Sequence, residues 1–230
     1  VDQEGVALID VVIQGTGKLG QMVFYLLRES TKHRVVAFAA DRQYCTTEQL
    51  LGVPLIPFDQ VERQFPPDGV GMLTVLGGLG GWAARKELYD RATAKGYRHL
   101  NYVHPTAIVQ GDQHWGDNNI VFPFAIVGFD GQMGNNNVLR EKVYLGHDFV
   151  IGDHTFIGVG CTIGGGARIG DGGYLAMGST VTNDITVGAG TFLGIGSLLL
   201  RDTDPHAMYL GHPAKKVSPA SSTSAPGGRA

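Results

Sequence analysis

The chain has 230 residues, of which 43% are hydrophobic and 17% charged, a composition typical of globular proteins with one or two domains. Its formal net charge of −3, without long runs of like charge, argues against nucleic-acid binding. No apolar stretch has the length of a membrane span and no signal-type segment opens the chain, so we expect a cytoplasmic protein that does not bind membranes. Cys45 and Cys161 are expected to be reduced thiols.

The first hundred residues alternate between predicted strands and predicted helices. Apolar, β-branched runs predict the strands, and the segments between them have the length and pattern of helices. The predicted strands are residues 6–14, 34–40, 71–76 and 98–101, and the predicted helices are residues 21–30 and 82–95. This alternation predicts a small parallel α/β sheet, a Rossmann-like domain.

A glycine-rich turn separates the first predicted strand from the first predicted helix. Gly15, Gly17 and Gly20 match the pattern G-x-G-x-x-G, which lets backbone N–H groups approach a pyrophosphate. Asp41 follows the next strand, where a carboxylate can meet a ribose hydroxyl. The region holds only one half of a dinucleotide-binding domain, which favours a nucleotide diphosphate over NAD. The expected nucleotide-binding residues are Gly15, Thr16, Gly17, Lys18, Asp41, Arg42 and Gly77.

The glycine motif also has a purely structural interpretation. The pattern alone is weak, and the turn could serve only to pack the helix on the strand. Both interpretations stay open on the sequence.

From Val103 to Leu199 every sixth residue is apolar, without exception. At 43% hydrophobic content, such a run arises by chance roughly once in a million trials. A period of six fits neither a helix nor a long strand. We interpret each hexad as one flat side of a coil, with its apolar anchor inside and the glycine that often follows the anchor taking the turn conformation. Three sides close a coil of about eighteen residues, and stacked coils form a parallel β-helix.

The sequence therefore predicts three parts. Residues 1–102 form the Rossmann-like domain, residues 103–204 form the β-helix, and residues 205–230 form a C-terminal segment. Within that segment, residues 218–230 are Ser, Pro, Gly and Ala with little else, which predicts a disordered tail.

The combination resembles the PglD- and NeuD-type bacterial sugar acyltransferases, in which a small Rossmann-like domain precedes a left-handed hexapeptide-repeat β-helix. The resemblance is carried by residues 12–20, 72–77, 85–96, 103–107, 145–152 and 211–215. It implies a left-handed coil, acetyl-CoA as the acyl donor, a nucleotide-linked amino sugar as the acceptor, and no metal. It also implies a homotrimer with the donor in the groove between two β-helices, since a chain this short has no second β-helix of its own.

In that family the histidine of the x-H-[DE]-x-x-I-G segment is the general base, which implies His147 here. Acyl transfer to an amine needs a base that works near neutral pH, which suits imidazole. Asp148 is expected to assist it, although adjacent residues meet only if the coil turns between them. The N–H of Gly165, about one coil further on, is the expected donor to the oxyanion. Attack would be direct, without an acyl-enzyme.

The acyl donor is expected to run along the coils. Gly165, Met177 and Ile195 occupy the third place of their hexads, where backbone groups can pair with the amides of pantetheine. Lys215 or Lys216, beyond the last coil, can meet the donor's phosphates, or can be a solvated tail.

The chain departs from the family pattern at two places. The family's glycine turn reads G-x-x-G-H-G, whereas Lys18 replaces the glycine at its fourth position and Leu19 replaces its histidine here. Phe156 stands where the PglD-type enzymes can carry a second histidine. These departures leave open the sugar, its nucleotide and the acyl group.

Other functions remain as alternatives. A sugar O-acetyltransferase of the sialic-acid type could use the same base. A metalloenzyme like the γ-carbonic anhydrases is disfavoured, because the spacing of His114, His147 and His154 does not match its zinc ligands. A non-catalytic β-helix protein and an NAD-dependent oxidoreductase are further alternatives. His154, His206 and His212 are otherwise expected at the surface, and His104 as a structural hydrogen-bonding group.

Overall fold

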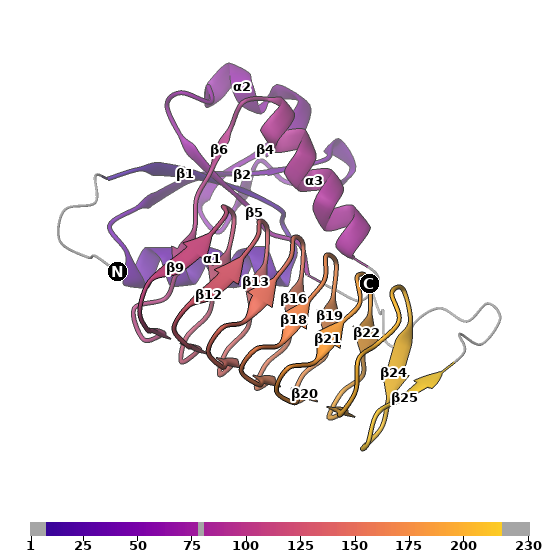
Figure 1. Ribbon diagram of the computed structural model, residues 1–230. Coiled ribbons are helices and arrows are strands. Elements are labelled where there is room, and N and C mark those ends of the chain that lie inside the picture. Colours follow the sequence, from indigo (N-terminus) through magenta and orange to yellow (C-terminus); the bar gives the residue numbers. More distant parts are fainter. Residues whose placement is uncertain (1–7, 78–80, 218–230) are drawn as a thin grey trace. The chain divides into compact units, whose positions relative to one another are not determined.

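The computed structural model describes residues 8–77 and 81–217, and the chain divides into two compact units, Val1–Asn101 and Tyr102–Ala230 (Figure 1). The first unit consists of a sheet with helices, and the second is a stack of coils. The tail predicted to be disordered lies outside the described residues. Among the helices that the structure describes, none is long and apolar enough to cross a membrane.

The first unit is built on a six-stranded sheet with the order β3-β4-β2-β1-β5-β6 (Figure 1). All neighbouring strands are parallel except β3 and β4, which are antiparallel. The strands are β1 (Asp10–Gln14), β2 (Arg34–Ala40), β3 (Gln49–Leu50), β4 (Val53–Pro57), β5 (Gly71–Thr74) and β6 (Arg98–His99). The helices are α1 (Lys18–Ser30), α2 (Val61–Gln64) and α3 (Trp82–Ala94), with short 3-10 turns at Arg42–Tyr44 and Phe58–Gln60.

The parallel α/β sheet agrees with the alternation of apolar runs. One face of the sheet packs on a core in which Val12 and Met72 meet Val61 of α2 and Ala92 of α3. The sequence analysis missed β3, β4 and α2. Pro54 and Pro57 argue against a strand at Val53–Pro57 in the sequence, because proline removes a donor from the ladder of hydrogen bonds between strands.

The second unit is a β-helix whose strands form three parallel sheets (Figure 1). Through residue 199, paired strands are parallel and lie 18 residues apart in the sequence, as Leu139 and Ile157 do. The first sheet contains β7 (Tyr102–Val103), β10 (Ile120–Val121), β13 (Val138–Leu139), β16 (Phe156–Ile157), β19 (Tyr174–Leu175), β22 (Phe192–Leu193), β24 (Met208–Leu210) and β25 (Lys215–Val217). The second contains β8 (Ile108–Val109), β11 (Ile126–Val127), β14 (Tyr144–Leu145), β17 (Thr162–Ile163), β20 (Thr180–Val181) and β23 (Leu198–Leu199). The third contains β9 (Gln113–Trp115), β12 (Gly131–Met133), β15 (Val150–Ile151), β18 (Arg168–Ile169) and β21 (Thr186–Val187).

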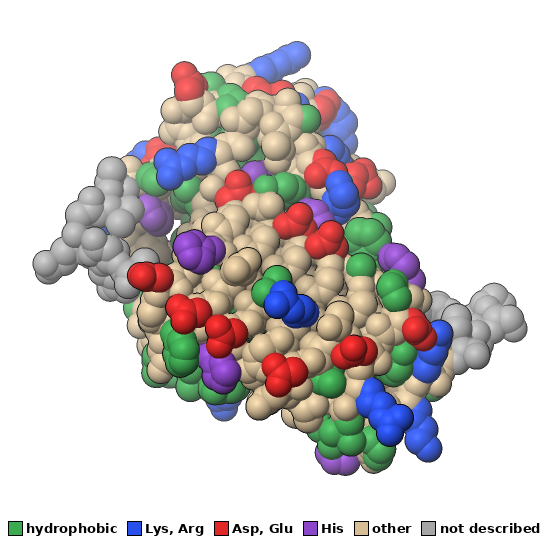
Figure 2. Space-filling view, in the orientation of Figure 1, with side chains coloured by type: hydrophobic (Ala, Val, Ile, Leu, Met, Phe, Trp, Pro, Cys, Tyr) green, Lys and Arg blue, Asp and Glu red, His purple; other side chains and the backbone are tan. Residues whose placement is uncertain are grey.

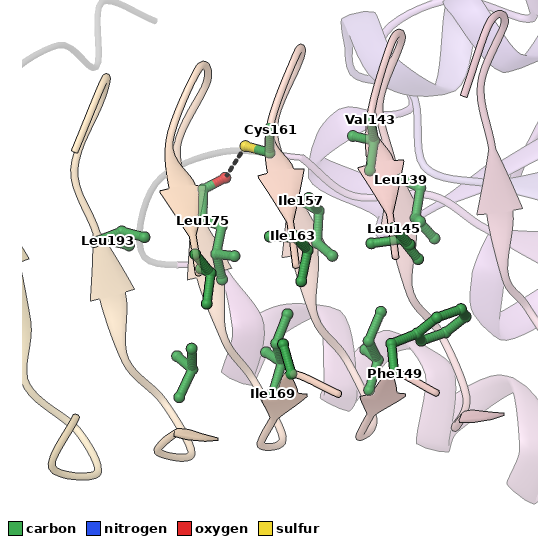
Figure 3. Packing of buried hydrophobic residues seen from close by; sticks show 14 of the residues in the cluster. Leu139, Val143, Leu145, Phe149, Ile157, Cys161, Ile163, Ile169, Leu175 and Leu193 are labelled. Carbon is green, nitrogen blue, oxygen red and sulfur yellow. Dashed lines mark hydrogen bonds between the residues drawn. The ribbon is translucent and has the colours of Figure 1, made fainter. Parts of the chain in front are cut away.

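The apolar anchors fill the inside of the coils (Figure 3). Leu139, Leu145 and Ile163 have no exposed surface, and the other anchors from Val121 onward are buried as well. Cys161 lies in the same core, with its Sγ 3.7 Å from the carbonyl oxygen of Leu175 (Figure 3). Burial raises the pKa of the Cys161 thiol, so this cysteine is a packing residue and not a nucleophile.

The glycines that follow the anchors have a different role from the one predicted. From Trp115 to Leu193 the left-handed turn residue is the third after each anchor, as at Asp148 with φ 54° and Gly166 with φ 71°. Gly146, directly after its anchor, has no positive φ, but a Cβ there would lie 2.4 Å from the backbone N of Gly165. The prediction of a turn role is therefore wrong: these glycines let successive coils approach each other.

Polar side chains join successive coils at the corner between the third and first sheets. The N–H of Asp117 donates to Oδ1 of Asn135 at 2.9 Å, and the N–H of Asn135 donates to Oδ1 of Asp153 at 2.6 Å. Asp171 continues the column. Figure 2 shows acidic side chains spread over the coils on the face in view. Such side chains supply acceptors for backbone N–H groups that the short strands leave unpaired.

The stack of coils runs past the predicted end at residue 204. β24 pairs in parallel with β22, and β25 turns back to pair antiparallel with β24. This hairpin covers the open edge of the first sheet and presents Lys215 and Lys216 there, a common protection of sheet edges.

Candidate active site

His147 and Asp148 lie in the turn between β14 and β15, at the corner joining the second and third sheets. Nδ1 of His147 is 2.6 Å from Oδ2 of Asp148. The left-handed backbone of Asp148, with φ 54°, turns the chain so that two adjacent side chains meet. The turn at Asp148 therefore allows the contact between the adjacent side chains of His147 and Asp148 that the sequence analysis expected only if the coil turned there.

The imidazole of His147 is held between the coils on either side. The ring of Phe129, one coil earlier, stacks on it with centroids 5.6 Å apart and an angle of 17° between the planes. A Cβ on Gly165, one coil later, would lie 2.6 Å from Nε2. Asp148 occupies Nδ1, and no described residue forms a hydrogen bond with Nε2. The side chain is 55% exposed, so the imidazole is accessible to a substrate.

Gly165 also presents a backbone donor at this corner. Its carbonyl oxygen accepts a hydrogen bond from the N–H of Asp184 at 3.0 Å, whereas its own N–H has no acceptor among the described residues. A backbone N–H without an acceptor is the kind of donor that stabilises an oxyanion.

Met177 and Ile195 lie at a different corner, between the first and second sheets. They stand one coil apart, since the N–H of Gly196 donates to the carbonyl of Met177 at 3.0 Å. Their side chains are 55% and 72% exposed, and Val159 continues the column one coil earlier. The structure therefore brings Met177 and Ile195 together and separates both from Gly165 within one chain.

The two lysines beyond the last coil differ in their surroundings. Nζ of Lys216 pairs with Oδ2 of Asp204 at 2.8 Å. Lys215 is exposed on β25 and has no charged partner among the described residues.

The three glycines of the turn after β1 each have a separate structural reason. Gly15 has φ 126°, and a Cβ there would lie 2.1 Å from the carbonyl oxygen of Val75. A Cβ on Gly20 would lie 2.2 Å from the carbonyl oxygen of Gly15, so Gly20 allows α1 to pack closely. Gly17 caps α1 and faces open space, which leaves the helix N-terminus accessible to an anion.

Other predicted nucleotide-binding residues surround this turn. Gly77, which follows β5, lies against Leu19 of α1. The ends of β1 and β5 are neighbours, because the two strands pair in parallel up to Gln14 and Thr74. The carbonyl of Thr16 accepts a hydrogen bond from the side chain of Gln21 at 2.9 Å. Lys18 is exposed on the first turn of α1.

Asp41 follows β2 and is paired with Arg91 of α3. The Arg91 guanidinium donates to both carboxylate oxygens, at 2.5 and 3.3 Å, and the hydrogen bond holds the pKa of Asp41 below its ordinary value. The neighbouring Arg42 is paired with Asp59 at 2.7 Å. The sequence analysis missed Arg91, since nothing in the α3 sequence marks which arginine reaches another strand.

A buried polar pair lies where β1 and β5 end. The hydroxyl of Thr74 donates to Oε1 of Gln14 at 2.8 Å. Gln14 is 1% exposed, and its Nε2 has no partner among the described residues. The sequence offered a signal here, since a glutamine ends an otherwise apolar strand directly before Gly15.

The remaining histidines do not form a metal site. No group of three metal-ligating side chains occurs among residues 8–77 and 81–217. The prediction that His154 lies at the surface is wrong: it is 6% exposed, and its Nδ1 is 2.9 Å from Nδ2 of Asn136 in a buried column that begins at Asn118. His104 accepts a hydrogen bond from the N–H of Thr106 at 3.2 Å, a local structural role.

Comparisons with known proteins bear on both units. The family model of the bacterial transferase hexapeptide (six repeats) matches residues 148–183. No curated protein matches the chain in sequence.

The fold is shared with solved acetyltransferases over nearly the whole chain. A mutant of perosamine N-acetyltransferase from Caulobacter crescentus, in complex with CoA and GDP-perosamine, is 25% identical with a TM-score of 0.83, covering 92% of this chain and 98% of that one. The acetyltransferase domain of PglB from Neisseria gonorrhoeae, in complex with acetyl coenzyme A, is 22% identical with a TM-score of 0.83, covering 92% and 100%. WeeI from Acinetobacter baumannii is 20% identical with a TM-score of 0.78, covering 92% and 100%. The chain thus carries hexapeptide repeats of the bacterial transferase type at residues 148–183 and shares the left-handed β-helix fold of these acetyltransferases.

Proposed function

We propose that the protein is an acetyl-CoA-dependent N-acetyltransferase that acts on the amino group of a nucleotide-linked amino sugar. The observation that carries the proposal is the His147–Asp148 pair, whose exposed imidazole lies against Gly165, a residue whose N–H has no acceptor among the described residues. The similar perosamine N-acetyltransferase was crystallised with CoA and GDP-perosamine, which supports the same classes of donor and acceptor here.

In the proposed reaction the acceptor amine attacks the thioester carbonyl while Nε2 of His147 takes a proton from the nitrogen. Asp148 accepts the Nδ1–H and keeps the ring in the tautomer whose Nε2 is unprotonated. The Gly165 N–H donates to the oxyanion. The tetrahedral intermediate then breaks its carbon–sulfur bond, and the imidazolium returns the proton to the leaving CoA thiolate. The amide and free CoA are the products, without an acyl-enzyme.

The first unit is proposed to be a Rossmann-like domain that binds the nucleotide part of the acceptor. The order β4-β2-β1-β5-β6 reverses direction at β1, and ligands of such sheets bind beyond the carboxyl ends of the strands at this point. The glycine turn follows β1, and Asp41 follows β2. Gly15, Thr16, Gly17 and Lys18 would meet the phosphates, with Asp41, Arg42 and Gly77 around the nucleoside.

A homotrimer would complete the site. His147 and Gly165 stand at one corner of the coil, whereas Met177 and Ile195 stand at another. A ring of three copies can bring one corner of one copy against a different corner of the next, in a closed arrangement. The base of one protomer and the pantetheine-binding column of another would then form one groove.

The cellular compartment follows from the same proposal. Both cysteines are free thiols, as expected in a reducing compartment, so we place the reaction in the cytoplasm.

The direct test is a screen of nucleotide-linked amino sugars with acetyl-CoA, in which the release of free CoA thiol is followed. We expect acetyl-CoA consumption that depends on one such sugar, with mass spectrometry of the product locating the acetyl group on nitrogen. A product acetylated on oxygen would instead identify a sugar O-acetyltransferase. No thiol release with any amino sugar would contradict the proposed function.

A further inference from the structure

The proposed base, His147, needs a structural feature that holds its imidazole in place, because both His147 and its partner Asp148 are exposed. The side chains of His147 and Asp148 are 55% and 61% exposed. A hydrogen bond between groups so accessible to water contributes little to holding a conformation. A general base must nevertheless stay within hydrogen-bond reach of the proton that it removes.

The corner itself shows what else confines the ring. The same place in successive coils is occupied by Gly111, Phe129, His147, Gly165, Asn183 and Arg201. Apart from His147, Phe129 is the single aromatic residue in this column. Its ring is nearly parallel to the imidazole, at 17°, and 5.6 Å from it between centroids. It is 49% exposed, so burial in the core does not explain a phenylalanine there.

The two neighbours act on opposite sides of the imidazole. Phe129 precedes His147 by one coil, and Gly165 follows it by one coil, where even a Cβ would come within 2.6 Å of Nε2. A ring between an aromatic face and a backbone has little freedom to change its rotamer. The hydrogen bond between Nδ1 and Asp148 is a further but weaker restraint.

We propose that Phe129 is a positioning residue for the base, an aromatic support that keeps the His147 imidazole at the corner with Nε2 directed to the substrate. This inference rests on the proposed function for its catalytic meaning. Its structural content, a ring held by another ring, can be tested without any substrate.

The test compares Phe129→Leu, which keeps an apolar side chain but removes the ring, with Phe129→Tyr, which keeps the ring. Phe124→Leu is the matched control, because Phe124 is 60% exposed at another corner of the same coil. Folding of each variant is checked by its unfolding temperature. The ¹H–¹³C NMR signals of the His147 ring, assigned by their loss in His147→Gln, report the ring current of residue 129.

We expect Phe129→Leu to shift these ring signals, while Phe129→Tyr and Phe124→Leu leave them nearly in place. A freed imidazole would populate up to three staggered wells instead of one, so kcat should fall by about 3- to 10-fold with KM unchanged. Phe129→Tyr should retain wild-type kcat. Unshifted ring signals, or a kcat in Phe129→Leu equal to that of Phe124→Leu, would overturn the inference. If the wild type acetylates no amino sugar, the proposed function fails, and the ring signals alone still decide whether Phe129 positions the imidazole.

Discussion

Replacing His147 by alanine should abolish most of the turnover and leave the fold and both binding sites in place. Among the described residues, the imidazole contacts the exposed side chains of Asp148 and Phe129 and the backbone at Gly165. The hydrogen bond that His147 makes through its carbonyl, from the N–H of Gly166, does not depend on the side chain. A surface substitution of this kind changes the free energy of unfolding by about 0.5 kcal/mol or less.

The size of the expected loss follows from the role of the ring. A positioned general base contributes about 10²- to 10⁴-fold to the rate, which is about 3–5 kcal/mol of activation free energy. His154 cannot take over, because it is buried and hydrogen-bonded at another corner of the coil. The Gly165 N–H remains as an oxyanion donor, so we expect residual turnover above the uncatalysed rate. Asp148→Asn should cost less than His147→Ala, because it removes only the partner of Nδ1.

The assay is thiol release at saturating and limiting acetyl-CoA. The loss in His147→Ala should appear in kcat, and donor affinity measured by calorimetry should be unchanged. Near-normal kcat in His147→Ala would refute the assignment and point to attack assisted by the substrate itself.

Four further outcomes test other parts of the site. Gly165→Ala should lower kcat by about 10- to 100-fold in the thiol assay, because the added Cβ would lie 2.6 Å from the imidazole nitrogen and displace the ring; unchanged kcat would show that the ring has room to move. Asp41→Asn should destabilise the protein at pH 7 but not at pH 2, in urea unfolding. The hydrogen bond from Arg91 lowers the pKa of Asp41 from 3.8, so the ion pair stabilises the fold above that pH and this stabilisation is lost as pH falls through the lowered pKa. Since both side chains are a third or more exposed, we expect the substitution to lower the free energy of unfolding by only ~0–1 kcal/mol at pH 7. An equal loss of unfolding free energy at both pH values would contradict this. Lys215→Ala combined with Lys216→Ala should weaken acetyl-CoA binding in calorimetry, more strongly at low salt, and unchanged affinity would mean that these lysines are solvated. Sedimentation should give a trimer, and an active monomer would refute the shared groove.

The sequence predicts the architecture well because its strongest signal is geometric. An apolar anchor at every sixth residue requires a short side and a turn, so the coil follows from positions such as Leu139, Leu145 and Ile151 without knowledge of any contact. The period also relates residues of successive coils. Phe129, for example, stands 18 residues before the base, as many as separate Leu139 from its strand partner Ile157.

The sequence-based predictions that are wrong concern residues whose surroundings depend on packing between elements. The sequence predicts a turn role for the glycines after the anchors, because it does not reveal that the next coil passes within 2.4 Å of a Cβ on Gly146. It also predicts that His154 lies at the surface, because a polar residue in a turn is usually exposed. Here the preceding coil provides Asn136 as a buried hydrogen-bonding partner instead. Arg91 was missed for the same reason, since its contact with Asp41 joins residues 50 positions apart.

The way the coils are filled also explains why the proposed chemistry needs a second copy. Anchor side chains occupy the interior of the β-helix and leave it no room for a substrate, so any site on this unit lies outside, at a corner. Asp148 at such a corner is 61% exposed, and bulk water weakens hydrogen bonds to a developing oxyanion. A neighbouring β-helix packed against this corner would exclude that water and bring its exposed Met177 and Ile195 to the thioester arm. We therefore infer that assembly and catalysis are coupled, and that a charge introduced at Ile195, which is 72% exposed in one chain, would reduce trimer formation and turnover together. If sedimentation of Ile195→Glu showed an intact trimer with full activity, this column would not face the active corner of a neighbour.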